Sequence, residues 1–201
     1  MNLGIRAKLW LGFLAITALG VIIGVIGIVN LNSMSDADTV LYENATLPVQ
    51  YASQAQGLVH RMRGNVTSSA LEATAEQVQY YKERLEGYVK LLIEAEEKFV
   101  EAITTDEERT LTEKAIGTQE LFLAQQEAVQ ELLVRGQYAE AGHLLKGDYK
   151  QAYEVFVADL ESLVAINIKN AKATSDGNTA LANQSSMILI GVLAISLAGA
   201  L

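Results

Sequence analysis

Residues 57–70, GLVHRMRGNVTSSA, hold the side chains with the clearest chemistry in this chain. His60, Arg61 and Arg63 fall within four positions, and no Asp or Glu occurs between positions 44 and 71. A guanidinium presents its donors in a planar fork that matches the two oxygens of a carboxylate. Acidic neighbours would compete for those donors, so the cluster suits an external anion. The alternative is a set of solvated charges whose stems cover apolar surface.

The helical positions of these side chains decide which of them can act together. At 3.6 residues per turn, Arg61 and Arg63 lie about 200° apart, so both cannot enter one pocket of one chain. His60 shares a face with Arg63, whereas Asn65 lies on the face of Arg61. A site that uses both arginines therefore needs more than one chain.

Apolar residues at alternating steps of three and four predict that the cluster belongs to a bundle of long helices. Such runs cover 78–102, 111–132 and 149–170, and a weaker one precedes residue 71. The second run places these residues in the core: Leu111, Ala115, Thr118, Phe122, Gln125, Val129 and Leu132. No strand pattern competes, so the expected fold class is all-α.

Local signals set the helix boundaries. Thr74 and Thr105 each precede Gln or Glu by three positions, the spacing of a capping box, and Gly136 is a stop signal. The predicted helices are roughly 31–71, 75–104, 106–134 and 138–186. Short loops between them predict an antiparallel up-down-up-down four-helix bundle, with a two-helix stalk where the outer helices extend beyond it. The single proline, Pro48, is expected to kink the stalk.

The outer helices run into two uncharged segments. Residues 9–29 contain no charge, and 21 residues span the roughly 30 Å of a hydrocarbon core. A cleaved signal peptide has a shorter apolar region, so we predict a transmembrane helix at 9–30. The second segment is continuously apolar over 187–201, which predicts the start of a second transmembrane helix in a piece of a longer protein.

The distribution of charge predicts on which side of the membrane each segment lies. Arg6 and Lys8 precede the first apolar run, so residues 1–8 are expected in the cytoplasm and residues 31–186 outside. The exported segment holds all 24 acids and 13 of the 15 bases, a net charge of −11. Nucleic acid and anionic lipid are poor partners for such a surface.

Other chemistry has little support in the sequence. The chain has no cysteine and only two histidines, His60 and His143, too few for a zinc site. No catalytic triad spacing or phosphate-binding glycine loop occurs, and the paired acids Glu96-Glu97 and Glu107-Glu108 are typical of a solvated face and a helix start. We therefore expect no enzyme activity, no metal and no cofactor.

In the predicted bundle, further residues lie at the same height along the bundle axis as the basic cluster. The fourth helix would place Lys146, Tyr149, Lys150 and Tyr153 at its height, and the second would place Tyr81, Arg84 and Tyr88 there. Tyrosines combine a packing ring with a hydroxyl, which suits a pocket for small polar molecules. Core packing is the simpler interpretation for the tyrosines on the seams. The candidate ligand-binding residues are His60, Arg61, Arg63, Asn65, Lys146, Tyr149 and Tyr153.

The chain resembles bacterial methyl-accepting chemotaxis proteins in four features. These are the start NLGIRAKLWLGFLAITALGVIIGVIGI, the Leu47-Pro48 pair, the Arg-bearing first helix and the segment RGQYAEAGHLLKGDY. The resemblance covers the N-terminal four-helix-bundle sensor with its flanking membrane helices. It implies a multi-pass inner-membrane protein, a periplasmic sensor domain at 31–186 and a homodimer whose first helices pair. Arg61 of one chain and Arg63 of the other would then face one cavity.

The resemblance further implies a small organic anion or amino acid as ligand, and signalling through helix four to a cytoplasmic kinase and coupling protein. Two alternatives remain open. The same sensor type occurs on histidine kinases and on diguanylate cyclases. A bundle of this kind can also sense a periplasmic protein partner without any small-molecule ligand.

Overall fold

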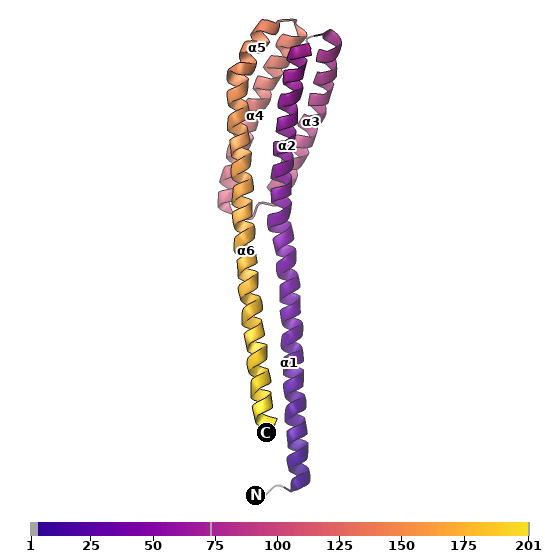
Figure 1. Cartoon of the computed structure of the whole chain (residues 1–201), viewed down its shortest axis with the longest axis vertical. Coiled ribbons are helices and arrows are strands. Elements are labelled where there is room, and N and C mark those ends of the chain that lie inside the picture. The colour runs from indigo at the N-terminus through magenta and orange to yellow at the C-terminus, as the bar shows by residue number, and fades with distance from the viewer. Residues whose placement is uncertain (1–3, 73, 201) are drawn as a thin grey trace. The chain divides into compact units, whose positions relative to one another are not determined.

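The computed structural model (Figure 1) describes residues 4–72 and 74–200, apart from the side chains of Lys8, Ala15 and residues 197–200. These residues form helices and connecting turns, with no strand among them. The elements in order are α1 (Ile5–Leu41), the π-helical turn η1 (Tyr42–Thr46), α2 (Leu47–Glu72), α3 (Ala75–Glu101), α4 (Asp106–Val134), α5 (Tyr138–Lys146) and α6 (Asp148–Ala200). The predicted all-α fold class is confirmed.

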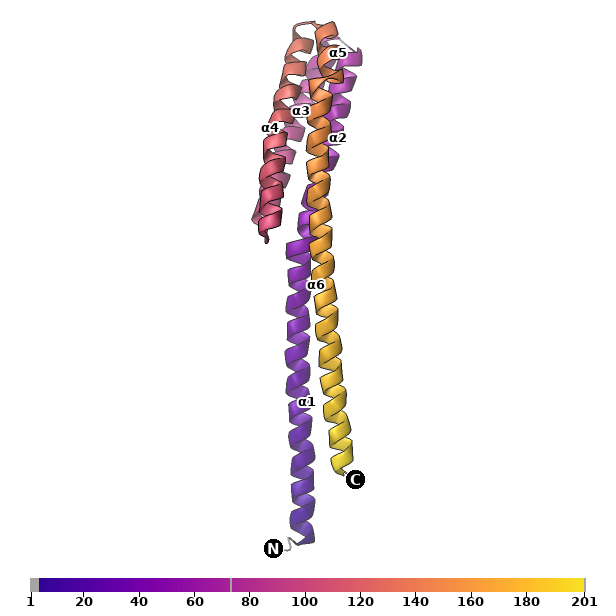
Figure 2. The same cartoon turned by 90° about the vertical axis from the view of Figure 1, so that its left-hand side faces the viewer.

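The chain divides into two compact units. One is a bundle made of Tyr42–Ala171, and the other contains the residues up to Leu41 together with those from Lys172. Within the bundle unit, α2, α3, α4 and the first part of α6 run side by side with alternating direction (Figures 1 and 2). This is the predicted up-down-up-down arrangement.

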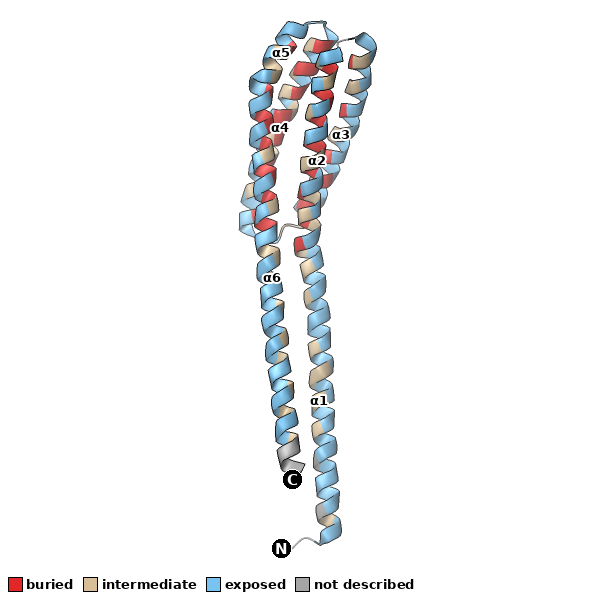
Figure 3. Cartoon of the chain, in the orientation of Figure 1, coloured by how far each residue is buried: buried red, intermediate tan, exposed pale blue. Residues whose placement is uncertain are grey.

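Burial follows the predicted seams on three of the four helices. Figure 3 shows the buried residues on the inner faces of the bundle helices. On α3 the buried positions include Leu85, Leu92 and Phe99, and on α6 they include Phe156 and Leu160. Burying such side chains contributes roughly 1.5–3 kcal/mol each, which offsets the entropy lost on ordering the helices.

The buried face of α4 is shifted by about one residue along the sequence from the predicted core face. The buried residues of this helix are Glu108, Thr112, Ala115, Gln119, Phe122, Gln126, Val129, Gln130 and Leu133. Leu111, Gln125 and Leu132, which the apolar pattern placed in the core, are only partly buried. Polar side chains at core positions weakened the periodicity on which the prediction rested. Glu108 marks the start of this helix, as predicted, and it is also buried, with 1% of its surface exposed.

Caps form where the sequence predicted them. The Thr105 hydroxyl accepts from the backbone of Glu108, whose side chain bonds back to the cap, and Thr74 accepts from Gln77 N. Gly136 has a φ of 73°, the left-handed conformation that ends α4 without a Cβ penalty. The predicted fourth helix is not continuous, however. It is interrupted at Gly147, which separates α5 from α6.

Pro48 is buried within the bundle unit, which corrects its predicted place in a stalk. A proline inside a helix lacks an N–H and its ring clashes with the carbonyl four residues earlier. The π-helical turn Tyr42–Thr46 lies immediately before it. A π turn adds one residue to the helical turn, and the carbonyl that the proline ring would meet, that of Asn44, lies within it.

The second unit pairs α1 with the end of α6. Asn178 Nδ2 donates a hydrogen bond of 3.2 Å to the carbonyl of Ala37. Within the described part of the chain, two helices are by length and composition apolar enough to cross a membrane, with 18-residue windows of mean hydropathy 2.6 and 1.4. Both windows are unburied, as apolar segments facing lipid would be.

Candidate ligand-binding site

The core stripe of α2 determines where the basic cluster points. Leu58, Val59 and Met62 are buried at 4% exposure or less, so they fix the inner face of this helix. His60 and Arg61 consequently lie on exposed positions, and Arg63 is half-buried. The cluster therefore lies on the outside of a single bundle, at positions where its charges stay hydrated.

Arg63 and His60 both contact Tyr153 of α6. The guanidinium carbon of Arg63 lies 4.3 Å from the centre of the Tyr153 ring, a cation–π contact. His60 Nδ1 and the Tyr153 hydroxyl are 2.6 Å apart, within hydrogen-bond distance. Tyr153 itself is 8% exposed. Two of the predicted site residues on α2 thus meet a third on α6.

Arg61 belongs to a different neighbourhood, beside α3. The Arg84 guanidinium donates to the Tyr88 hydroxyl at 2.9 Å and to the Tyr80 hydroxyl at 3.1 Å. The hydrogen bond from Arg84 lowers the pKa of Tyr88, and the nearby charge of Arg61 lowers it further. Arg61 and Arg63 therefore face opposite sides of α2, as their helical positions predict.

The remaining predicted residues do not join one pocket. Asn65 is buried and its amide donates to the Arg61 carbonyl at 2.7 Å, which ties it to its own helix. Tyr149 is 1% exposed and packs on Phe122 at 5.6 Å between ring centres, so burial raises the pKa of its phenol. Lys146 is exposed on α5. These three positions belong to the core or to the surface near the cluster.

The arginines of the cluster have no acidic partner among the described residues. The ion pairs there are Lys114–Asp159, Arg135–Glu131, Lys150–Glu154 and Lys169–Glu107. Arg61 and Arg63 are thus free to bind an external carboxylate. Tyr80 and Arg84 were not in the predicted site, although their spacing of four, shared with Tyr88, is the signal of one helix face.

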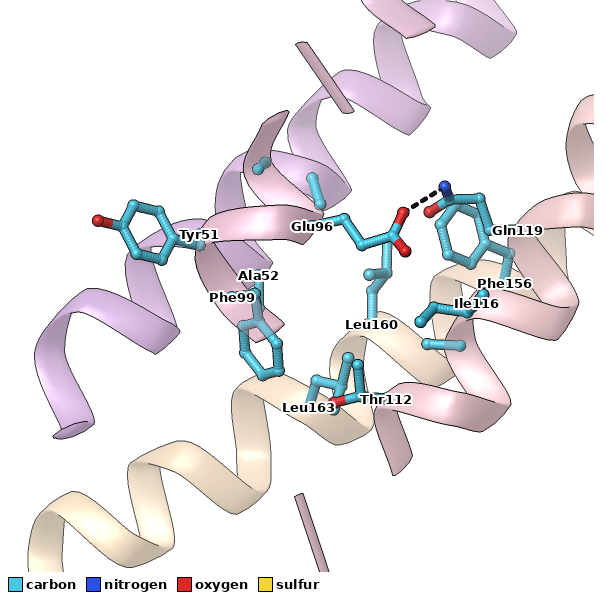
Figure 4. Close-up of a pocket in the computed structure, with 13 residues that line it drawn as sticks. Tyr51, Ala52, Glu96, Phe99, Thr112, Ile116, Gln119, Phe156, Leu160 and Leu163 are labelled. Carbon is cyan, nitrogen blue, oxygen red and sulfur yellow. Dashed lines mark hydrogen bonds between the residues drawn. The ribbon is translucent and has the colours of Figure 1, made fainter. Parts of the chain in front are cut away.

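A cavity between the helices of the bundle is too small for an organic carboxylate. Figure 4 shows this cavity, of about 30 Å³, with Ala52, Phe99 and Leu160 among its lining residues. Gln119 Nε2 donates to Glu96 at 2.6 Å at its wall. Space of that size holds about one water molecule. The surface around Arg61 and Arg63 remains the candidate site.

Residues 2–182 match the family described as a four helix bundle sensory module for signal transduction, so the chain belongs to this family. No curated protein matches the chain. Members of the family are signal-transduction modules and generally not enzymes.

Proposed function

We propose that this chain is the sensor region of a bacterial chemoreceptor that binds a small organic carboxylate at the surface around Arg61 and Arg63. The observation that carries this is the stacking of Arg63 on Tyr153 at 4.3 Å, with no carboxylate of the described residues paired to either arginine. The ring orients the guanidinium, which leaves its donors directed at a ligand.

The opposite directions of the two arginines support a homodimeric site. Arg63 is oriented by α6 and Arg61 lies beside Tyr88 of α3. If α2 pairs with its symmetry mate, Arg61 of one chain and Arg63 of the other can line a shared cavity, and the two-fold axis then repeats the same pairing with the chains exchanged. Such a dimer contains two equivalent sites.

The signal would travel along α6. This helix has no break between Asp148 and Ala200, so it joins the residues at the candidate site to the segment that can cross a membrane. A ligand that favours one packing of α6 in the bundle shifts the population of its position. In this proposal the bundle is periplasmic, the protein lies in the inner membrane, and a cytoplasmic chemotaxis kinase with its coupling protein receives the signal.

Thermal unfolding tests the ligand class. The whole chain in detergent micelles would be heated with single amino acids and organic acids while circular dichroism follows the loss of helix. Ligand at 100 times its dissociation constant stabilises the folded state by about 2.7 kcal/mol. We expect a shift with one class of carboxylate, and none with the matching amide or alcohol. Equal shifts with the uncharged analogues would contradict a carboxylate clamp.

A further inference from the structure

Buried carboxylates link α4 to α6 at two levels of the bundle. Asp159 of α6 is 4% exposed, and its two oxygens contact Lys114 Nζ at 2.7 Å and the Thr118 hydroxyl at 2.9 Å. Glu108 of α4 is 1% exposed and accepts a hydrogen bond of 2.8 Å from the side-chain amide of Asn170. Each carboxylate is therefore held by side chains of the other helix.

The two links lie far enough apart to fix the position of one helix along the other. From Asp159 to Asn170 the α6 axis advances roughly 16 Å, at about 1.5 Å per residue. From Thr118 back to Glu108 the antiparallel α4 axis advances roughly 15 Å. Because the two spacings agree, both links form in the same register, and neither can shift along the helices while the other stays in place.

Sliding of α6 along α4 would break these links. A slide of two residues is about 3 Å, and even at right angles to the hydrogen bonds it would stretch them to about 4 Å, beyond the usual limit of about 3.2 Å. Thr118 and Asn170 have short side chains that cannot follow such a slide. The carboxylates of Glu108 and Asp159 would then be buried with fewer partners, which is strongly unfavourable for a charged group.

The polar links between α6 and α2 are of a different kind. Gln56 Nε2 donates to Glu161 at 3.3 Å in an exposed position. His60, which is also exposed, lies 2.6 Å from the Tyr153 hydroxyl. Water replaces the lost partner of an exposed side chain, so these hydrogen bonds resist displacement less than the buried carboxylates do. The buried links therefore hold α6 more firmly to α4 than its polar links hold it to α2.

Buried polar groups also tie α4 to α3 and to the turn between them. Gln119 is 8% exposed, and its Nε2 donates to Glu96 at 2.6 Å. The second oxygen of Glu108 accepts from the backbone N–H groups of Thr104 and Thr105 in the α3–α4 turn, at 2.9 and 3.0 Å. A displacement of α4 would therefore reach this turn.

We propose that α4 and the bundle part of α6, residues 148–171, form one rigid body that moves against α2, so that any displacement of α6 also displaces α4 and the α3–α4 turn. The rigid body depends on the buried links alone and needs no ligand. Its displacement by a signal rests on the proposed function, in which a ligand beside Arg63 and Tyr153 acts at the interface between α2 and α6. The motion would be a shear between packed helices.

Native-state hydrogen exchange of the whole chain in detergent micelles tests the rigid body without any ligand. In the wild type, we expect the most protected backbone amides of α4 and of residues 148–171 to open with the same free energy and the same dependence on denaturant, as one cooperative unit. In the double variant Thr118→Val/Asn170→Leu, residues 148–171 should exchange about tenfold faster than α4, because the links that join the helices are weakened.

A matched control uses the same kinds of substitution outside the interface of α4 with α6. Thr110 donates to the Asp106 carbonyl of its own helix, and Gln56 links α2 to α6. Thr110→Val/Gln56→Leu should therefore leave the exchange of α4 and of residues 148–171 equal. Unequal values in the wild type, or equal values in Thr118→Val/Asn170→Leu, would overturn the rigid body and would leave the carboxylate site on α2 untouched.

Distances between spin labels give a second readout that leaves the buried links intact. The chain has no cysteine, so labels can be attached at Glu113→Cys on α4, Ser162→Cys on α6 and Gln54→Cys on α2, all at exposed positions. Pulsed electron paramagnetic resonance should give a narrower distance distribution for the α4–α6 pair than for the α2–α6 pair. An α4–α6 distribution as broad as the α2–α6 distribution would contradict the proposal, even if Thr118→Val/Asn170→Leu failed to fold.

Discussion

The carboxylate of Glu108 accepts a hydrogen bond of 2.8 Å from the side-chain amide of Asn170, 62 positions further along the chain. Its other oxygen accepts from the backbone N–H groups of Thr104 and Thr105 at 2.9 and 3.0 Å. One buried carboxylate thus ties the turn between α3 and α4 to α6. A signal that moves α6 within the bundle must carry this turn along or break the bond.

Replacing Glu108 by Ala should lower the free energy of unfolding by about 2 kcal/mol, because it leaves buried donors without an acceptor. Glu107→Ala is the matched control. Glu107 is exposed and its ion pair with Lys169 spans 3.6 Å, so its loss should cost less than about 0.5 kcal/mol. Urea unfolding followed by circular dichroism measures the free energy of unfolding of both variants. Similar losses of free energy in the two variants would contradict the role given to Glu108.

The stability of the bundle should depend on pH through the same residue. Burial raises the pKa of Glu108, but hydrogen bonds from Thr104, Asn170 and Thr105 outweigh it, so the pKa lies below its ordinary value of 4.5. The stabilisation is therefore present above pH 4.5 and disappears as the pH falls through the lowered folded-state pKa. Glu108→Gln should flatten this part of the pH dependence of unfolding. An unchanged slope in that variant would show that other carboxyls cause it.

The ion pair between Lys114 and Asp159 should respond asymmetrically to mutation. Lys114 Nζ lies 2.7 Å from Asp159 Oδ1, and their side chains are 63% and 5% exposed. Lys114→Met leaves a buried carboxylate whose one remaining partner among the described residues is the Thr118 hydroxyl, at 2.9 Å, and should cost about 2 kcal/mol. Asp159→Asn leaves a solvated lysine and should cost less than about 1 kcal/mol. Chemical unfolding of both variants measures the two losses in the free energy of unfolding. A larger loss for Asp159→Asn than for Lys114→Met would refute this explanation.

Two glycines on and beside α4 should respond in opposite directions to alanine. Gly136 has a φ of 73°, so Gly136→Ala should cost about 1 kcal/mol. Gly117 lies inside the helix with nothing within 4 Å of an added Cβ, so Gly117→Ala should stabilise by about 0.5–1 kcal/mol. Melting temperatures of the two variants should move apart. A shared direction would mean that the end of α4 does not need a left-handed residue.

The fold was largely predictable because apolar seams and caps follow simple helical spacing. Leu85, Leu92 and Phe99 showed the inner face of α3 directly, and Thr105 marked the start of α4. The exact face of α4 was not predictable from hydrophobicity, because Gln126 and Gln130 occupy core positions that a periodicity argument assigns to the surface.

Contacts between distant segments were harder to foresee. The opposite directions of Arg61 and Arg63 follow from 3.6 residues per turn, whereas the stacking of Arg63 on Tyr153 depends on how α2 and α6 pack. The burial of Glu108 depends on Asn170 reaching the α3–α4 turn. A local capping pattern shows the start of a helix but not which side chain from another helix covers it.

Complementation between subunits tests the central claim most directly. Chains carrying Arg61→Ala and chains carrying Arg63→Ala would be produced separately and then coexpressed, and the binding capacity for the carboxylate from the thermal screen would be titrated. If Arg61 of one chain and Arg63 of the other clamp one ligand, neither variant alone binds. The mixture regains roughly a quarter of the wild-type sites, because half of the dimers are mixed and each has one intact cavity. Binding by either variant alone, or none by the mixture, would contradict a site shared across the dimer.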